Sequence, residues 1–412
     1  MHDEGHDKTS EPPRRLLLGA GPSPIPEAVR RAGARPTVGH LDPWFQEFME
    51  GMKARLRAVW RTANRMTLPF SAPASAAMEA ALFALADEGD EIAVIVHGAF
   101  GARLAEMARR QGLVVHRIDV AWGEAPEPGA LEDLLRREPG IRLVAFVHAE
   151  TSTGVAADAA ALAAIAHRHD CLVLMDAVTS LAGQPVLPDE WGIDFAYAGS
   201  QKCLSAPPGL APVTVSEAAL RRMQQRRRAC RSWFGDILEI ARYWDGREGR
   251  SYHHTAPVNA LYALDEALRI FLAEGHEAAF ARHRRAHEAL VAGLEVLGLT
   301  LLPAPECRLA QLNAVVVPEG VDEARLRADL LARHGIEISA GLGSLAGRIV
   351  RIGLMGDGAR LANVLAVLTG LQDALARQGW RRPAGSAEAA AIAAHDRADM
   401  QPAHGRPARA TG

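Results

Sequence analysis

Short apolar runs alternate with helical stretches between about residues 68 and 216, and this alternation restricts the possible folds more than any other feature. Helical stretches such as FGARLAEMARRQ and DAAALAAIAHRH separate the runs. Strands that alternate with helices are typical of βαβ units, so the pattern predicts an α/β fold with a mainly parallel sheet wrapped by helices. The predicted strands are EIAVIVH (91–97), LVVHRI (113–118), RLVAFVH (142–148), CLVLMD (171–176) and DFAYAG (194–199).

A different pattern follows and predicts a smaller second domain. A helical block covers about 257–297, followed by a strand (313–318), a helix (322–334), a strand (348–354) and a helix near 359–377. This order is typical of an α+β unit. We therefore expect an N-terminal tail (1–14), a large domain (15–256), a small C-terminal domain (257–380) and a low-complexity tail (381–412).

Composition excludes several classes of function. The formal net charge is −3 with both signs mixed along the chain, so we expect no binding to nucleic acid or to an anionic membrane. The basic run 221–231 has no interleaved aromatic residues and is interpreted as a solvated helix running into a mobile loop. No apolar run reaches the roughly 18 residues of a membrane span, and the N-terminus has no signal-peptide pattern. These features predict a soluble protein.

The cysteine and histidine patterns predict a cytoplasmic protein that binds no metal. Four cysteines show neither CxxC pairing nor regular spacing, which argues against a disulfide framework and a zinc site. His167 and His169 are two apart on a predicted helix, and the adjacent His253 and His254 are expected to point to different sides. Neither pair suits a metal ion.

Polar groups follow three of the predicted strands. Asp176 ends one apolar run, His148 ends another, and the residues GSQK follow a third. Ligands of open α/β sheets bind outside the carboxyl ends of the strands. We therefore expect a site there, although an isolated Asp at a strand end more often caps a turn.

Lys202 stands among small residues, after GSQ and before CLSAPPG. A lone lysine is usually a surface charge, but one held at a strand end by a small-residue turn can lose its proton by desolvation and form a Schiff base. A lysine imine to a pyridoxal ring needs a carboxylate at the pyridine nitrogen, and Asp176 precedes Lys202 by 26 positions. The turn 71–75, which leads into an Ala-rich helix, is a candidate phosphate site or an ordinary helix cap.

Seven stretches together resemble the class V, fold type I pyridoxal-phosphate aminotransferases, in particular the alanine-glyoxylate and serine-glyoxylate group, over about residues 15–378. The resemblance implies an α/β large domain with a mainly parallel seven-stranded sheet, a smaller α+β domain and a homodimer. The stretches are LLLGAGPSPIPEAV, MEAALFALADEGDE, HAETSTGV, VLMDAVTSLAGQPV, GIDFAYAGSQKCLSAPPG, SYHHTAPVNALYAL and AGLGSLAGRIVRIGLMG.

The resemblance also implies residue roles. Lys202 would hold pyridoxal 5'-phosphate as an internal aldimine and move a proton between the substrate α-carbon and the cofactor. Asp176 would pair with the pyridine nitrogen, and Phe100 would stack on the ring, where several members have Trp. Thr151 would lie beside the phenolic oxygen or the substrate carboxylate. Arg351 would bind the substrate α-carboxylate through both guanidinium nitrogens.

The phosphate would be held by both subunits of the dimer. Ala74, Ser75 and Gln201 would contact it from one subunit, and Tyr252 and Thr255 from the other. The sequence departs from the family here, because the usual Gly-rich turn is SAPAS and Pro73 removes one backbone donor. Which group fills the missing contact is left open.

The function implied is transamination of a small amino acid, alanine or serine, with glyoxylate or pyruvate. A pyridoxamine-pyruvate transaminase, or a lyase on the same fold, is the alternative within the cofactor class. A non-catalytic binding module with the same fold is the alternative outside it.

Overall fold

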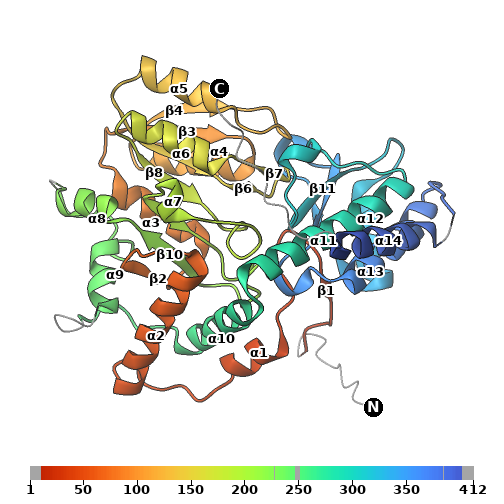
Figure 1. The fold of residues 1–412 in the computed structure, drawn as a ribbon, viewed down its shortest axis with the longest axis horizontal. Coiled ribbons are helices and arrows are strands. Elements are labelled where there is room, and N and C mark those ends of the chain that lie inside the picture. The colour runs from red at the N-terminus through yellow and green to blue at the C-terminus, as the bar shows by residue number, and fades with distance from the viewer. Residues whose placement is uncertain (1–10, 227, 246–250, 384, 401–412) are drawn as a thin grey trace, which may run out of the picture.

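The computed structural model describes residues 11–226, 228–245, 251–383 and 385–400. Its largest element is a seven-stranded sheet (Figure 1). Only β10 runs antiparallel to its two neighbours, so the sheet is mainly parallel, as predicted. In spatial order the strands are β2 (Met66–Phe70), β10 (Ala211–Val215), β9 (Phe195–Tyr197), β8 (Leu172–Asp176), β5 (Ile141–Val147), β3 (Glu91–Val96) and β4 (Val114–Asp119).

The five runs predicted from the sequence are all strands of this sheet, and the α/β fold class is confirmed. The central strands are apolar along nearly their whole length because helices cover both faces of the sheet. In β3, for example, every residue from Ile92 to Val96 is buried. The two strands missed by the prediction, β2 and β10, are short and contain Pro69 and Pro212, which weaken a strand signal.

Helices surround the sheet (Figure 1). Two of them begin just after strands and point their N-termini toward the carboxyl edge: α3 (Ala74–Leu85) follows β2, and α4 (Ala99–Arg110) follows β3. Short strands β6 (Ala149–Glu150) and β7 (Val155–Ala156) form a hairpin at this edge. The other helices of this part are α1 (Glu27–Gly33), α2 (Pro43–Trp60), α5 (Pro128–Arg137), α6 (Ala159–Arg168), α7 (Pro188–Trp191), α8 (Glu217–Gln224) and α9 (Ile237–Trp244).

The C-terminal part has its own three-stranded antiparallel sheet, and a two-stranded parallel pair joins it to the start of the chain. In that pair Leu16 lies opposite Ile336, so the N-terminal arm belongs to this part of the molecule. The strands are β1 (Leu16–Leu17), β11 (Leu312–Val316), β12 (Ile336–Glu337), β13 (Ser339–Ala340) and β14 (Ile349–Gly353). The helices are α10 (Val258–Glu274), α11 (His276–Val296), α12 (Glu323–His334), α13 (Leu361–Ala376) and α14 (Ser386–Met400), with 3-10 turns at Pro305–Cys307, Gly343–Leu345 and Gly356–Gly358.

Two large hydrophobic cores divide the chain at a different place from the predicted domain boundary. Helix α10 contributes Leu261 and Phe271 to the core of the large sheet, together with α1 and α2. The second core begins within α11, at Ala286, and includes Leu18 of the N-terminal arm, although Leu309, Leu312 and Met355 still belong to the first core. The packing therefore changes inside α11 and not at residue 257.

Helix α14 differs from the low-complexity tail predicted for 381–412. It packs against α11 and α13, and its Ala387 and Ala391 are buried in the second core. Alanine is the best helix former, and alanines four apart make a flat stripe that allows close approach to another helix. A Cβ on Gly293 of α11 would lie 3.1 Å from the Ala387 carbonyl oxygen, which shows how close the two helices are. Residues 401–412 and 1–10 lie outside the described residues.

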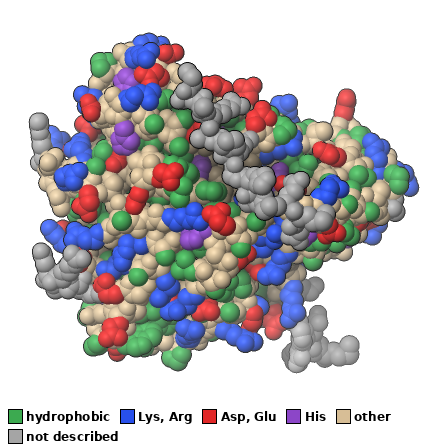
Figure 2. Space-filling view, in the orientation of Figure 1, with side chains coloured by type: hydrophobic (Ala, Val, Ile, Leu, Met, Phe, Trp, Pro, Cys, Tyr) green, Lys and Arg blue, Asp and Glu red, His purple; other side chains and the backbone are tan. Residues whose placement is uncertain are grey.

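The basic run 221–231 is held by acidic residues and is not simply solvated. Arg222 pairs with Asp90 at 2.8 Å, and Arg226 pairs with Asp87 at 2.8 Å. Figure 2 shows basic and acidic side chains spread over the same face of the molecule. Within the described part of the chain, no helix is long and apolar enough to cross a membrane.

Candidate active site

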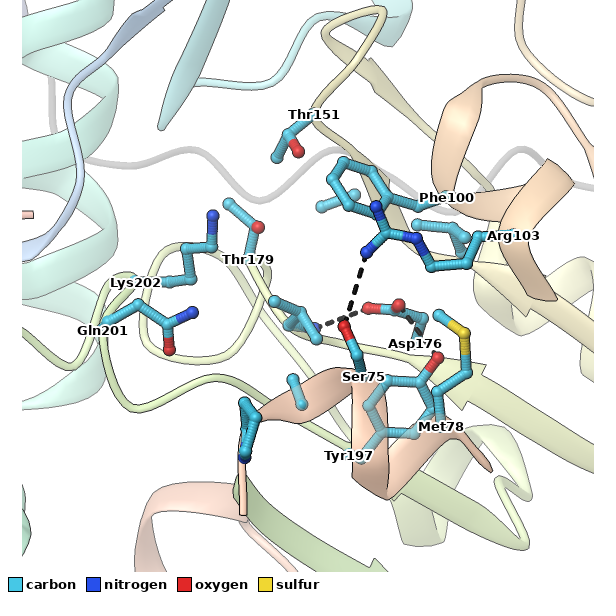
Figure 3. Close-up of a pocket in the computed structure, with 15 residues that line it drawn as sticks. Ser75, Met78, Phe100, Arg103, Thr151, Asp176, Thr179, Tyr197, Gln201 and Lys202 are labelled. Atoms are coloured by element: carbon cyan, nitrogen blue, oxygen red, sulfur yellow. Dashed lines mark hydrogen bonds between the residues drawn. The ribbon is translucent and has the colours of Figure 1, made fainter. Parts of the chain in front are cut away.

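A cavity that is partly open to solvent lies at the carboxyl edge of the large sheet (Figure 3). Seven of the ten residues predicted for the site line it, although they come from five separate segments of the chain. They are Ala74, Ser75, Phe100, Thr151, Asp176, Gln201 and Lys202.

Asp176 lies at the inner end of this cavity, at the end of β8. One carboxyl oxygen accepts a hydrogen bond from the Val178 N–H at 2.8 Å, and the other accepts one from the Tyr197 hydroxyl at 2.9 Å. Only 4% of the residue is exposed, and burial raises the pKa of the carboxyl to about 6 against the effect of these two donors. The carboxyl is therefore oriented by the protein, and a cation placed beside it would favour its charged form.

The partner of Asp176 is set by strand register. Tyr197 lies directly opposite Asp176 in the β8–β9 ladder, and its hydroxyl is fully buried. Burial and the neighbouring carboxyl raise the pKa of Tyr197 well above its usual value, so the phenol remains a donor. The sequence analysis missed this residue, because the pairing register of two strands cannot be deduced from a three-residue strand.

Lys202 lies in the loop after β9 and points into the same cavity. Its amine donates a hydrogen bond to the carbonyl of Ala20 in the N-terminal arm, and 9% of the residue is exposed. Burial, assisted by the nearby Arg351 cation, lowers the pKa of the amine to about 8. An appreciable fraction of the amine is thus neutral near physiological pH, which is the state that a nucleophilic lysine requires.

The N-terminal arm fits closely around this lysine. Gly21 has a φ of +102°, and a Cβ there would lie 2.6 Å from the Lys202 amine nitrogen. Only glycine satisfies both the backbone conformation and the close approach. Ser23 adds a hydrogen bond from its hydroxyl to the Lys202 carbonyl oxygen at 2.7 Å.

Phe100 projects from the first turn of α4 into the cavity (Figure 3). A buried carboxyl holds this turn, because Glu150 accepts hydrogen bonds from the Phe100 and Gly101 N–H groups at 3.0 and 3.1 Å. Burial raises the pKa of Glu150, and hydrogen bonds from Ser152 and this turn oppose the rise. Glu150 lies within the motif HAETSTGV, but the sequence analysis assigned it no role.

The first turn of α3 forms one wall of the cavity. Within the described residues, neither the Ala74 nor the Ser75 N–H has a hydrogen-bond partner, and both are near the positive end of the helix. Pro73 occupies the N-cap position and offers no N–H. The turn therefore has two free backbone donors and one hydroxyl for an anion.

Arg351 lies on β14 and is not among the residues that line the cavity. Its side chain donates to the Ala340 carbonyl at 2.7 Å and to the Thr151 carbonyl at 3.2 Å, and 6% of the residue is exposed. Because Thr151 lines the cavity, the Arg351 guanidinium lies next to the cavity, separated from it by the Thr151 carbonyl.

Tyr252 and Thr255 are outside the cavity of their own chain. Tyr252 is 63% exposed, and its hydroxyl is 3.3 Å from the Thr255 hydroxyl. His254, which lies between them, contacts the turn before α3, because its Nε2 is 2.7 Å from the Ser71 hydroxyl oxygen.

The histidine geometry differs from the expectation in one respect. The His253 and His254 rings lie at nearly a right angle to each other and are in contact, with their Nδ1 atoms 2.8 Å apart. In the described part of the chain, a different group, Glu91, His116 and Glu138, brings three ligand atoms within 4.8 Å of one another. It lies at the opposite end of the sheet from the cavity, where β3 begins. The absence of a bound metal stays a prediction.

Arg103 is a further cavity residue that the sequence analysis missed. It lies one helical turn after Phe100 on α4, and its guanidinium carbon is 4.9 Å from the centre of the Phe100 ring. Residues three apart share a helix face, so the position of Phe100 could have indicated it. The cavity is also lined by Met78, Val178, Thr179 and Tyr197.

Comparisons with known proteins agree with this geometry. The chain is 36% identical to the (S)-ureidoglycine–glyoxylate transaminase of Bacillus subtilis, over 95% of this chain and 98% of that protein. The crystal structure of the ureidoglycine–glyoxylate aminotransferase from Bacillus subtilis matches with a TM-score of 0.91, covering 94% of this chain and 100% of that one. The alanine–glyoxylate aminotransferase of Nostoc sp. matches with a TM-score of 0.87 at 40% identity, covering 89% of this chain and 97% of that one.

A third solved structure is also similar. The pyridoxamine-pyruvate aminotransferase of Mesorhizobium loti matches with a TM-score of 0.88 at 30% identity, covering 93% of this chain and 97% of that one. The family model described as Aminotransferase class-V matches residues 19–358, which include every residue of the cavity. The chain therefore belongs to the class V aminotransferases.

Proposed function

We propose that this protein moves an amino group from a small amino acid, alanine or serine, to glyoxylate or pyruvate, with pyridoxal 5'-phosphate as its cofactor. The observation that carries the proposal is that the Lys202 amine and the Asp176 carboxyl, both buried, line one cavity at the carboxyl edge of the sheet. A structural lysine or a turn-capping aspartate has no reason to face a shared cavity.

The residues present fit this cofactor. Asp176 is a buried acceptor whose charged form needs a cationic neighbour, and the free amides of α3 offer an anion site on the adjacent wall. Gln201 and Ser75 add polar side chains, and Phe100 offers a flat apolar surface. When bound, the cofactor supplies an electron sink for the charge that develops at the substrate α-carbon.

Each buried residue then has a defined task. The lysine amine, with its pKa lowered to about 8, takes up and returns the proton of the substrate α-carbon. Asp176, held by the Val178 N–H and the Tyr197 hydroxyl, keeps a proton on the ring nitrogen. The surrounding apolar side chains and the N-terminal arm exclude water, which strengthens both interactions.

The substrate carboxylate is assigned to Arg351 and Thr151. The Arg351 guanidinium is rigidly held by the Ala340 and Thr151 carbonyls, at 2.7 and 3.2 Å. Burial lowers the pKa of Arg351, but a guanidinium is not deprotonated in proteins and the side chain stays charged. A planar cation fixed next to the cavity is suited to bidentate binding of a carboxylate.

We propose a homodimer in which each cavity is completed by Tyr252 and Thr255 of the partner subunit. In support, both residues lie outside the cavity of their own chain, and Tyr252 is exposed together with Trp233 and Phe234. Exposed aromatic side chains of this kind are enriched at interfaces. A cytoplasmic location is also proposed, on the ground that all four cysteines are free thiols.

A second amino donor deserves the same test. The relative with a TM-score of 0.91 is named for ureidoglycine and glyoxylate, so (S)-ureidoglycine is an equally good candidate for the amino donor of this chain. The two candidates share glyoxylate as acceptor. One missing group in a pocket changes discrimination by only about 1–3 kcal/mol, and the fold does not decide between such donors.

The deciding experiment follows the cofactor spectrum and the product together. Purified protein is mixed with alanine, serine or (S)-ureidoglycine in separate half-reactions, and glyoxylate is then added. We expect the spectrum to change with at least one donor and glycine to form from glyoxylate. If pyridoxamine and pyruvate react while no amino acid does, the pyridoxamine-pyruvate alternative replaces the proposal. Release of ammonia without formation of glycine would indicate a lyase, and a colourless protein that binds no cofactor would indicate a binding module.

A further inference from the structure

We infer that Arg103 is a ligand of the cofactor phosphate and takes the place of the backbone donor that Pro73 removes. This inference rests on the proposed function, since it presupposes that the cavity holds a phosphorylated cofactor. Neither the family resemblance nor the comparisons assigned a role to Arg103.

Arg103 lies beside the first turn of α3. One of its terminal nitrogens lies 3.4 Å from the Ser75 hydroxyl, across the cavity from its own helix (Figure 3). Ser75 belongs to the first turn of α3, where two backbone N–H groups are free. The guanidinium therefore already lies at the wall of the cavity that offers donors to an anion.

In the part of the chain that the structure describes, the charge of Arg103 is not balanced by a neighbouring carboxylate. Among the described residues, no carboxylate lies within salt-bridge distance of its guanidinium. In contrast, Arg109 and Arg110 on the same helix both pair with Glu106, at 2.8 and 2.7 Å. Arg103 instead packs against the Phe100 ring, which orients the guanidinium without neutralising it. A cation that is oriented but unpaired is available for an anionic ligand.

A bound phosphate group needs more positive charge than the first turn of α3 offers. A phosphate monoester carries about −1.5 to −2 charges near pH 7, and a helix N-terminus offers the equivalent of only about +0.5. The cavity is lined by only two cationic side chains, Lys202 and Arg103, within the part of the chain described. Lys202 gives up its ammonium charge when it reacts as a nucleophile. Arg103 remains to balance the phosphate.

The same geometry argues against a role for Arg103 in binding the substrate carboxylate. Arg351 is next to the cavity at Thr151, whereas Arg103 contacts the first turn of α3. Pro73 at this turn is the position where a backbone donor is lost. A side chain with several N–H donors in a planar group can supply that contact and a second one at the same time.

The test compares a phosphorylated with an unphosphorylated ligand. Cofactor is removed from the full-length protein, and binding of pyridoxal 5'-phosphate and of pyridoxal is titrated by absorbance and by quenching of intrinsic fluorescence. The variants are Arg103→Gln and Arg103→Lys. Arg110→Gln is the matched control, because Arg110 lies on the same helix, is exposed, and leaves Glu106 paired with Arg109.

We expect Arg103→Gln to weaken binding of pyridoxal 5'-phosphate by about tenfold or more, since a charge-assisted contact is lost, and to leave pyridoxal binding unchanged. Arg103→Lys should be intermediate. Inorganic phosphate should raise the melting temperature of the cofactor-free wild type and of Arg110→Gln, but not that of Arg103→Gln. This readout does not depend on enzyme activity.

Three outcomes would overturn the inference. Equal weakening of both ligands would assign Arg103 to packing on Phe100. Unchanged affinity for pyridoxal 5'-phosphate with a raised KM for the amino donor would assign it to the substrate. Loss of phosphate protection in Arg110→Gln as well would show a non-specific charge effect. Failure of the wild type to bind pyridoxal 5'-phosphate would instead refute the proposed function, and so the two failures can be told apart.

Discussion

The inner end and the outer rim of the cavity are built in different ways. At the inner end, Asp176 and Tyr197 lie on neighbouring parallel strands, opposite each other in register, and both are buried. At the rim, Ser75 and Arg103 are exposed and come from two different helices, α3 and α4. The inner groups cannot move without disturbing the sheet, whereas the rim can vary. The departure from the family pattern, Pro73, lies at the rim.

The comparison implies that changes at the inner end affect chemistry and changes near the substrate affect binding. The largest effect is expected for Lys202→Ala. Under the proposed function this amine both links the protein covalently to the cofactor and transfers the proton, so its loss should lower kcat/KM by about 10³-fold or more. Steady-state rates and the visible absorbance band measure this. A variant with more than a tenth of wild-type activity would show that another group performs the proton transfer.

A smaller loss is expected for Asp176→Asn. The amide cannot hold a proton on the ring nitrogen as a carboxylate does, so kcat should fall by about 10²-fold. Tyr197→Phe is the control, because it removes one hydrogen bond of 2.9 Å and keeps the charge, and it should cost only a few-fold in kcat. Equal losses in the two variants would contradict the view that the charge of Asp176 is what matters.

Arg351→Lys should change binding more than chemistry. Lysine keeps the charge but cannot form the planar pair of contacts, so KM for the amino donor should rise by about tenfold while kcat changes little. Initial rates over a range of donor concentrations separate the two constants. A fall in kcat at unchanged KM would place Arg351 in the chemistry of the inner end.

The smallest effect concerns stability without cofactor. Burial raises the pKa of Asp176 from 3.8 to about 6, so the folded state holds the proton more tightly than the unfolded chain does. Above about pH 6 the buried carboxylate therefore lowers the free energy of unfolding by its full amount. This destabilisation disappears as the pH falls below about 4. Asn has no charge to bury but loses one hydrogen bond, which offsets part of the gain.

We thus expect cofactor-free Asp176→Asn to be more stable than wild type by about 1 kcal/mol at pH 7.5, with the difference shrinking toward pH 4.5. Denaturant unfolding at several pH values measures this. A difference that stays constant with pH would show that the carboxyl of the inner end is not protonated in this range.

Local sequence patterns predicted the parallel sheet well because each strand is a continuous apolar run between helical stretches. They failed for α14, where an Ala-rich segment was interpreted as low complexity although Ala387 and Ala391 are buried in the second core and Ala387 lies close to Gly293 of α11. They also failed for Tyr197, which is identified only by the register of β8 and β9.

Lys202, its small neighbours and Asp176 led to the prediction of a pyridoxal-type site, together with the family resemblance, because amine and carboxyl chemistry belongs to the side chains. Only the tertiary structure decided how those groups are tuned. The raised pKa of Asp176, the lowered pKa of Lys202 and the position of Arg103 at Ser75 all depend on burial and contacts between segments far apart in the chain. Desolvation is a property of the packed molecule, and no local pattern of residues contains it.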